Sequence, residues 1–374
     1  MIRIEEISTL AGFKDMEAEW GSLLGESGST DLFLTFDWLF TWWKHFSAKN
    51  TLFILRITEG GVLVGIAPLM IRRYKLSGFP VRGVFFMGFP VSDRMDFILK
   101  GPDKAGYISA ILKYLKANAR RWDLADFQEM PGPSGNFRVL RERAGVLGFP
   151  AIHGDDKKSF YLSFRGTRDD FLKSLSGNTL QHLRKASRRL RKKDPGFQCR
   201  RFIGALDGKM NPGELVSEME RIEGLSWKGG RGTGIFSRAD TRGFHADIIN
   251  NYFGKGLLDI SFLRVNGANI AYQYNYLSGS RIYNYSIAYD RRYGDLSPGF
   301  ALYINILEDS FGRGIDEFDF LRGDEGFKKS LASDYRIHAR TRMFNHSPYS
   351  KFLFAAHGMR ITFKEAKGVL FKKD

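Results

Sequence analysis

Apolar and polar residues follow a clear order near the C-terminal end of the chain. Residues 282–289 are rich in β-branched and aromatic side chains, as a half-buried strand requires. A polar segment follows, and then Ser297 and Pro298, which suit the N-cap and the first position of a helix. An apolar stripe continues to Phe311, and residues 318–321 begin another strand. The pattern predicts a strand, a turn, a helix and a second strand.

A similar order of elements is predicted on each side of residue 165. Each half has helices first, then an antiparallel meander, a helix, a strand, a helix and a last strand. We recognise no repeat of individual residues behind this similarity of plan. A long polar helix over 167–193 is predicted between the halves. The fold class is therefore α+β, with a mixed, mostly antiparallel sheet flanked by helices in each half.

The length of the chain sets the number of domains. A chain of 374 residues is too long for one ordinary core and suggests about two domains. We predict an N-terminal domain at 1–165, a connecting basic helix at 166–195 and a C-terminal domain at 196–348. Residues 349–374 mix phenylalanine and leucine with lysine, which predicts a basic amphipathic tail. Such a tail either docks on the protein or lies on an anionic membrane surface.

Charge constrains the partners of the protein. The chain carries 57 Lys and Arg against 41 Asp and Glu, a formal net charge of +16. Nucleic acid, anionic lipid and phosphorylated small molecules all attract such a surface, so charge alone does not choose among them. Much of the excess lies in residues 184–193. On an amphipathic helix these cations either bind RNA or lipid or simply face water.

Other features of the composition narrow the compartment and the chemistry. A single cysteine, Cys199, excludes an internal disulfide and gives no indication of an oxidising compartment. Acidic residues interrupt the N-terminal segment where a signal peptide needs an apolar run, so we expect a cytoplasmic protein. The seven histidines lack metal-ligand spacing, and no metal site is predicted. Serine-hydrolase and Walker motifs are also missing.

Five segments of the chain carry a family resemblance. They are FLTFDWLFTWWKHF at 33–46, FLKSLSGNTLQHLRKASRRLRKK at 171–193, GLSWKGGRGTG at 224–234, YDRRYGDLSPG at 289–299 and FDFLRGDEGFKK at 318–329. In this order they resemble the GNAT acyltransferase superfamily. More narrowly, they are similar to the double-GNAT branch with the Fem-type peptidyltransferases and the CelD-like acetyltransferases of polysaccharide gene clusters. The resemblance implies two tandem GNAT-like domains, the first of them degenerate.

The turn before the predicted helix is the candidate donor site. A helix N-terminus just past a strand end offers free N–H groups and a positive dipole end to an anion. In GNAT proteins this place holds the pyrophosphate of acyl-CoA. The resemblance implies the same role here for Arg291, Gly294, Ser297, Pro298 and Gly299. Leu296 departs from the superfamily turn, which has glycine or alanine there, and Fem-type relatives use the same fold for aminoacyl-tRNA.

The candidates for chemistry are Asp290, Tyr285 and Lys328. Asp290 either accepts the proton of an attacking amine or favours the dipole of the next helix, and its position does not choose between these roles. The resemblance implies that Tyr285 protonates the leaving thiolate and that Lys328 pairs with a phosphate or an acyl carboxylate. The structural alternatives are packing of Tyr285 on one strand face with Tyr283 and Tyr289, and a solvated helix lysine at 328.

A glycine-rich segment is the candidate acceptor site. Trp227 and Lys228 precede glycines at 229, 230, 232 and 234. The tryptophan favours a mobile loop over the acceptor, and a plain flexible linker is the alternative. The spacing of these glycines does not match a dinucleotide-binding fingerprint.

These features together predict an N-acyltransferase that moves an acetyl or other acyl group from acyl-CoA to an amine, without a metal. The resemblance implies a small-molecule or glycan acceptor, such as an amino sugar for surface polysaccharide. The alternatives are a Fem-like peptidyltransferase that uses aminoacyl-tRNA and a non-catalytic scaffold that binds a membrane or a partner. DNA is not expected as a partner. We expect a cytoplasmic location, with peripheral contact at the inner membrane left open.

Overall fold

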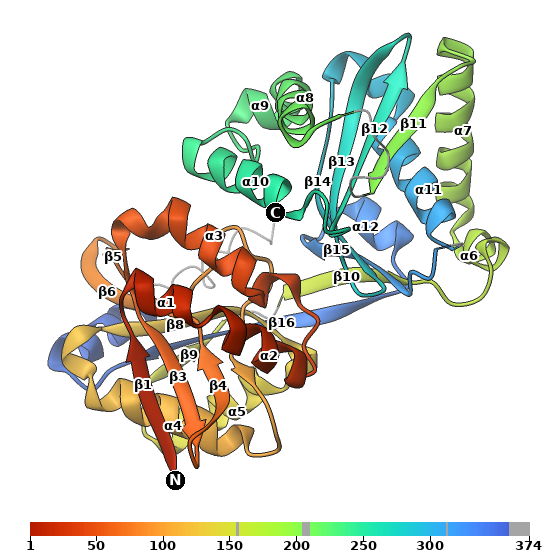
Figure 1. The fold of residues 1–374 in the computed structure, drawn as a ribbon. Coiled ribbons are helices and arrows are strands. Elements are labelled where there is room, and N and C mark those ends of the chain that lie inside the picture. The colour runs from red at the N-terminus through yellow and green to blue at the C-terminus, as the bar shows by residue number, and fades with distance from the viewer. Residues whose placement is uncertain (155–156, 204–209, 312, 359–374) are drawn as a thin grey trace, which may run out of the picture. The chain divides into compact units, whose positions relative to one another are not determined.

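The structure is a computed structural model that describes residues 1–154, 157–203, 210–311 and 313–358. The chain divides into two compact units (Figure 1). The first unit contains residues 1–157 and 337–374, and the second contains residues 158–336. Both combine helices with sheets, which confirms the predicted α+β class. In the described part of the chain no helix is long and apolar enough to cross a membrane.

The first unit has two groups of paired strands. One has the order β1-β3-β4-β7, and the other has the order β16-β8-β6-β5-β2, with β9 also paired to β16. Their bounds are β1 (Ile2–Ile7), β2 (Asn50–Leu52), β3 (Ile54–Glu59), β4 (Val62–Ala67), β5 (Leu69–Leu76), β6 (Phe79–Phe86), β7 (Ile98–Leu99), β8 (Leu124–Pro131), β9 (Ala151–His153) and β16 (Asp334–Phe344).

Aromatic side chains form much of the core of the first unit. The bounds of its helices are α1 (Leu10–Asp15), α2 (Glu17–Glu26), α3 (Phe36–Phe46), α4 (Lys104–Ala117) and α5 (Asn136–Val146), with 3₁₀ turns η1 (Leu32–Leu34), η2 (Ser47–Lys49), η3 (Ala119–Arg121) and η4 (Gly132–Ser134). Thr35 caps α3, because its side chain accepts a hydrogen bond from the Trp38 amide. The helical spacing of Trp38 and Trp42 then turns both indoles into the core.

The second unit contains the predicted strand–helix–strand segment. Its strands have the order β11-β12-β13-β14-β15-β10. Their bounds are β10 (Lys157–Ser163), β11 (Gln198–Ile203), β12 (Leu258–Val265), β13 (Ala268–Ser278), β14 (Arg281–Tyr289) and β15 (Glu317–Arg322). The helices are α6 (Arg168–Ser174), α7 (Gly177–Lys193), α8 (Pro212–Leu225), α9 (Trp227–Arg231), α10 (Ala239–Tyr252), α11 (Pro298–Ser310) and α12 (Gly326–Leu331), with the 3₁₀ turn η6 (Arg291–Leu296).

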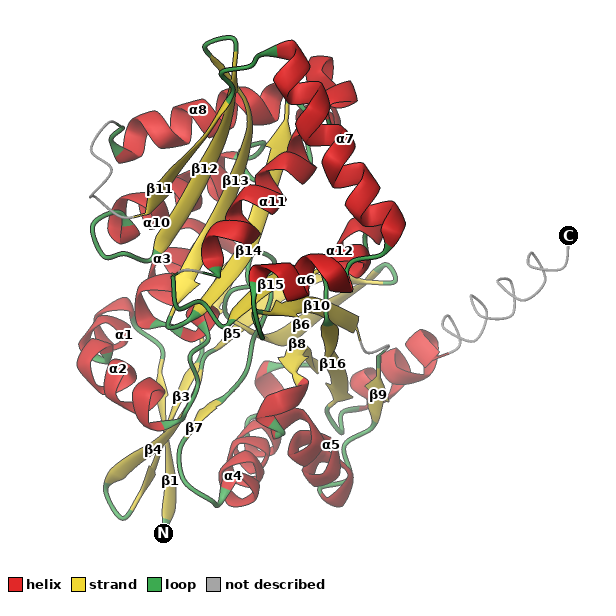
Figure 2. Ribbon diagram, turned by 90° about the vertical axis from the view of Figure 1, so that its right-hand side faces the viewer, coloured by secondary structure: helices red, strands yellow, loops and turns green. Residues whose placement is uncertain are grey.

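Helices cover both faces of the strands of the second unit. Helices α8, α9 and α10 lie on one side of β12–β14, and α7 and α11 lie on the other (Figure 1). Figure 2 shows the second unit from the side of α7 and α11. Helix α7 buries Leu183, Ala186 and Leu190, as the helical spacing predicts, while most of its cations are exposed. The basic run is therefore the outer face of an amphipathic helix.

Each unit contains a parallel strand pair among its described residues. In the first, Gly83 of β6 pairs with Leu124 of β8, and in the second, Arg281 of β14 pairs with Glu317 of β15. In both β8 and β15, the dipeptide Asp-Phe begins two residues after the paired residue, at 126–127 and at 319–320. Strands β8 and β15 therefore carry Asp-Phe at matching register positions.

The unit boundaries differ from the predicted ones at both ends. The first unit ends at 157 rather than 165, and residues after 157 in β10 pair with β15 of the second unit. The last strand was expected in the C-terminal domain at 196–348. Residues 338–344 of β16 belong instead to the first unit, because they pair antiparallel with β8. The reason is long-range pairing, which local periodicity does not encode.

The beginning of the predicted tail packs on the first unit. Residues 348–358 are helical. Leu353 is buried in a cluster with Val81, Leu124 and Phe344, and the Tyr349 hydroxyl donates a hydrogen bond to the carbonyl of Pro80. This part of the tail docks on the protein, and residues 359–374 lie outside the described residues.

Replacement of Asp126 by alanine should destabilise the first unit. Its carboxylate is buried and binds the guanidinium groups of Arg340 and Arg342, each at 2.6 Å. Loss of the carboxylate leaves these cations without their partner, which should lower the free energy of unfolding by about 3 kcal/mol in urea denaturation. Asp169→Ala is the control, since Asp169 is exposed and its ion pair spans 3.7 Å, and it should leave the unfolding midpoint unchanged.

The cost of Asp126→Ala should depend on pH. Burial alone would raise the pKa of Asp126, but the hydrogen bonds and charges of Arg340 and Arg342 outweigh it and hold the pKa below 3.8. A lowered folded pKa stabilises the protein above the unfolded pKa, and this contribution is lost as pH falls through the folded value. The difference between wild type and variant should therefore shrink in acid. A difference that stays constant on acidification would contradict this account.

Candidate functional site

The ladder between β14 and β15 is short. The strands pair in parallel only where Arg281, Ile282 and Tyr283 face residues 317–319. Strand β14 nevertheless continues to Tyr289 and β15 to Arg322. The later residues of β14 are therefore not part of that ladder.

A β-bulge lies in β14 directly after the end of this ladder. Tyr274 of β13 pairs with Ser286, whereas Asn275 pairs with Asn284, so Tyr285 is the extra residue of β14. Its ring lies 4.9 Å from the ring of His245 in α10. The Ser286 hydroxyl lies 3.2 Å from the hydroxyl of Tyr272 on the same side of the sheet. Two consecutive side chains thus face α8 and α10, which a regular strand does not allow.

The bulge corrects the prediction that Tyr285 and Tyr289 share a strand face. Tyr289 packs with Leu190 and Leu302, on the side of α7 and α11. Tyr285 contacts His245 on the opposite side. Because one extra residue shifts the alternation of side chains, the face of Tyr285 could not be obtained from a regular strand period.

Asp290 holds the turn that follows β14. Its buried carboxylate accepts a hydrogen bond from the Arg292 amide at 3.0 Å and forms an ion pair with the Arg292 guanidinium at 2.6 Å. The hydrogen bond from Arg292 is the main reason that the pKa of Asp290 lies below its usual range. Asp290 is therefore an anion that fixes η6, and a lowered pKa makes it a weaker proton acceptor.

The first turn of α11 is not closed by its N-cap residue. Ser297 has a left-handed backbone, with φ of 52°, and its side chain makes no capping hydrogen bond. Pro298 occupies the first helical position, as predicted, and the position of a Cβ on Gly299 would lie 3.5 Å from Ile287 of β14. The start of this 13-residue helix thus faces β14 with free amides and a positive dipole end.

Two further cations lie at the turn between β14 and α11. The Arg189 guanidinium of α7 donates a hydrogen bond to the carbonyl of Asp295 at 2.7 Å, so the basic helix holds the turn from outside. The Arg291 guanidinium lies beside α9, since a Cβ on Gly230 would be 3.9 Å from it. Gly294 approaches the ring of Tyr289, where its Cβ would be 3.8 Å away.

Lys228 reaches the bulged strand. Its side chain comes from α9 and donates hydrogen bonds to the carbonyl of Ile287 at 2.8 Å and to the hydroxyl of Ser286 at 3.3 Å. Burial lowers the pKa of Lys228, and the charge of Lys328 lowers it further. Trp227, in contrast, is 47% exposed, with Arg231 stacked over its ring. The structure thus places Lys228 at the bulge and Trp227 on the surface.

The glycines after Trp227 fit close packing. Residues 227–231 are helical, so this part of the predicted loop is α9. A Cβ on Gly229 would lie 2.5 Å from the carbonyl oxygen of Glu223, and one on Gly234 would lie 2.0 Å from its carboxylate. Glu223 is buried and accepts hydrogen bonds from the Tyr272 hydroxyl and the Phe236 amide. The glycines therefore let α9 approach α8 closely and bring Lys228 to β14.

Lys328 is buried at the end of β15. It is 7% exposed, its ammonium donates to the carbonyl of Arg322, and it lies 3.1 Å from the carboxylate of Glu325. Gly323 has φ of 117°, and a Cβ there would lie 2.8 Å from the Lys328 ammonium. Lys328 is therefore not the solvated helix lysine of the alternative interpretation. The structure gathers it with Lys228 and Glu325 near the ends of β14 and β15.

The sequence analysis missed a buried polar cluster behind the bulge. Tyr274 and Tyr276 alternate on β13, and their hydroxyls form a hydrogen bond with each other. The Tyr276 hydroxyl also lies 3.5 Å from Nδ1 of His245, while Nε2 of His245 has no partner among the described residues. Burial lowers the pKa of His245 to about 3, so the ring is neutral. The alternating tyrosines of β13 were a signal for this cluster, whereas the lone histidine was not.

Comparison with known proteins places this site in a class. Residues 177–329 match the acetyltransferase (GNAT) domain family. The structure resembles that of FemX, with a TM-score of 0.61, 12% identity and coverage of 94% of this chain and 100% of the other. It also resembles a tandem GNAT protein from the clavulanic acid biosynthesis pathway, with a TM-score of 0.53, 12% identity and coverage of 93% of this chain and 100% of the other. For L-PGS from Bacillus licheniformis the TM-score is 0.51, the identity is 13%, and 91% of this chain and 96% of the other are covered. No curated protein sequence matches the chain.

The second unit therefore contains a GNAT domain, and the chain has the fold of tandem GNAT proteins. The predicted superfamily and the class of GNAT-type acyltransferases are confirmed. Identities of 12–13% to these structures show a common fold and do not transfer their substrates.

Replacement of Gly229 by alanine should disturb the site through packing. The new methyl group would meet the Glu223 carbonyl at 2.5 Å, so α9 must move away from α8. We expect a loss of about 2 kcal/mol in thermal unfolding. Gly224→Ala is the matched control, because nothing lies within 4 Å of its Cβ position on α8, and it should gain about 0.5 kcal/mol. Equal effects of the two variants would show that the close approach is not needed.

Proposed function

We propose that this protein transfers an acyl group from acyl-CoA, with acetyl-CoA as the first candidate, to an amine. The observation that carries the proposal is the extra residue Tyr285, which follows the last β14–β15 pair and precedes the open N-terminus of α11. A bulge beside an ended ladder presents backbone groups to a ligand. The helix start can hold phosphate oxygens at the other end of the same ligand.

The donor would lie along β14 toward α11. Binding of the pyrophosphate would be favoured by the amides of the first turn of α11, from Gly299 onward. The guanidinium of Arg291 would favour it as well. Ser297 and Gly294 shape the turn. Strand groups near Tyr285 would polarise the thioester carbonyl, as donors aimed at a developing oxyanion do. This arrangement fits an extended carrier with charge at one end and a reactive carbonyl at the other.

The chemical step would be direct attack. The amine nitrogen bonds to the thioester carbonyl carbon, the C–S bond breaks, and the thiolate takes a proton from Tyr285. The proton of the amine leaves to water. The predicted alternative acceptor is Asp290, but its ion pair with Arg292 favours a role in holding η6. We assign Lys228 and Lys328 to positioning, because each donates to a backbone carbonyl beside the site.

The acceptor would approach from the side of α9. Trp227 exposes its indole there and offers an apolar surface to a small molecule or a glycan. An amino sugar for surface polysaccharide, in the cytoplasm or at the inner membrane, follows only from the family resemblance.

A Fem-like transfer from aminoacyl-tRNA is the second candidate. The exposed cations of α7 favour it, because Arg188, Arg191 and Lys192 all face away from the buried stripe of the helix. The donor assay below separates the two candidates.

Gly299→Trp should abolish acetyl-CoA binding in calorimetry. The indole would fill the space between α11 and β14, where the Cβ position already lies 3.5 Å from Ile287, and affinity should fall at least about 100-fold. Gly177→Trp is the control, since its Cβ position on α7 has nothing within 4 Å. Equal affinity of the variants would remove the donor site. Absence of acetyl-CoA binding in wild type, with a salt-dependent affinity for aminoacyl-tRNA, would favour the second candidate.

Tyr285→Phe should slow transfer without weakening donor binding. Loss of a general acid should reduce kcat about 100-fold, with KM for acetyl-CoA unchanged. The measurement is CoA thiol release with a panel of amino sugars. Tyr289→Phe is the control on the same strand, because Tyr289 packs on the opposite side of the sheet. If both variants keep wild-type turnover, Tyr285 is not the acid.

A further inference from the structure

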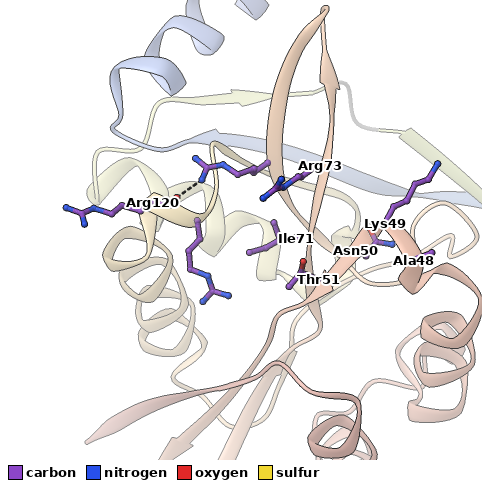
Figure 3. A pocket seen from close by; sticks show the side chains of 9 residues that line it. Ala48, Lys49, Asn50, Thr51, Ile71, Arg73 and Arg120 are labelled. Carbon is purple, nitrogen blue, oxygen red and sulfur yellow. Dashed lines mark hydrogen bonds between the residues drawn. The ribbon is translucent and has the colours of Figure 1, made fainter.

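The first unit contains a cationic groove that none of the functional predictions uses. It has a volume of about 660 Å³ and lies among η2, β2, β5, β6 and η3. Figure 3 shows Arg73 between Lys49 on one side and Arg120 on the other. Its cationic side chains are Lys49, Arg73, Arg82, Arg120 and Arg121.

Strand register brings these cations together. Arg73 of β5 is directly opposite Arg82 of β6. Arg82 also donates a hydrogen bond to the carbonyl of Arg120 at 2.6 Å, which ties η3 to the strand. Strand β2 pairs with β5 at Asn50 and Arg72, and Lys49 directly precedes this pair at the start of β2. Like charges held this close repel one another, which an anion would relieve.

Two carboxylates neutralise part of the groove and stiffen its wall. Asp123 binds Arg82 at 2.7 Å, and it also accepts a hydrogen bond from the Arg82 amide. Glu6 binds Arg121 through two hydrogen bonds, at 2.6 and 2.9 Å, and Arg121 stacks over the ring of Phe53. These two guanidinium groups are therefore fixed before any ligand arrives.

Three cations of the groove remain for a ligand. Lys49, Arg73 and Arg120 are exposed, and in the described residues no carboxylate pairs with their side chains. Two of the three are arginines, whose planar forks match oxygens of phosphoryl groups better than lysines do. The surplus of positive charge exceeds what one carboxylate would balance.

The size and lining of the groove narrow the class of ligand. A volume of about 660 Å³ is much larger than a single phosphate needs and falls within the range of small-molecule sites. No aromatic side chain among the described residues lines it, so these residues do not provide the stacking surface of a single-stranded nucleic acid site. Ile71 and Thr51 provide a small neutral floor.

We propose that this groove binds the phosphoryl groups of a molecule with two or more of them, such as a diphosphate ester. The proposal concerns the first unit and does not depend on acyl transfer by the second. A soluble diphosphate and the headgroup of a phospholipid that carries two phosphates share the recognised chemistry, and the experiment separates them.

The test is calorimetric titration of the full chain with inorganic pyrophosphate. Arg73→Ala/Arg120→Ala should bind at least about 100-fold more weakly than wild type, because each arginine supplies charge-assisted hydrogen bonds. Arg3→Ala/Lys113→Ala removes the same charge from exposed positions of the first unit that do not line the groove, and it should keep wild-type affinity. No binding by wild type, or an equal loss in both double variants, would overturn the proposal. A thermal unfolding midpoint of the groove variant equal to that of wild type shows that the chain is still folded.

A second measurement identifies the source of the phosphoryl groups. The same variants are floated with vesicles that contain cardiolipin, whose headgroup carries two phosphates, and with neutral phosphatidylcholine vesicles. Loss of flotation only in Arg73→Ala/Arg120→Ala would assign the groove to a lipid headgroup. Equal flotation of wild type and both variants, with the pyrophosphate difference retained, would assign it to a soluble diphosphate.

Discussion

One extra residue in β14 is the constraint on which the candidate site depends. Strands β14 and β15 pair in parallel over three residues, and the β13 register then skips Tyr285. The bulge sends Tyr285 toward His245 and leaves the following residues to lead into the turn before α11. A regular strand would place Tyr285 with Tyr289. The face of the sheet on which Tyr285 lies is therefore a property of the register.

Buried charged side chains form hydrogen bonds around β14 and β15. Lys228 and Lys328 each donate to a main-chain carbonyl, while Glu223 accepts from Tyr272. Such groups cost desolvation energy unless their hydrogen bonds are satisfied, so they define the geometry around β14 and β15 tightly. The close contacts at Gly229 and Gly323 are part of the same arrangement, because a side chain at either position would displace it.

The two units share an arrangement of strands but differ in the charged groups around it. Each has a parallel pair with Asp-Phe at the same place. In the first unit the aspartate, Asp126, forms ion pairs with Arg340 and Arg342. The cationic side chains of the groove lie at other strands of this unit. In the second, the strands lead to an open helix start. A shared fold is therefore compatible with a different binding chemistry in each unit.

The sequence by itself determined the class of fold, the order of elements and the strand–turn–helix–strand segment at 282–321. Local periodicity and the Ser-Pro pair were enough, since Ser297, Pro298 and the stripe of α11 lie within a few residues of one another. Tertiary structure alone decided the bulge at Tyr285, the burial of Lys328, the cluster around His245 and the assignment of β16 to the first unit. The reason is physical: strand register and the solvation of a charge depend on residues far apart in the chain, and a single sequence records neither.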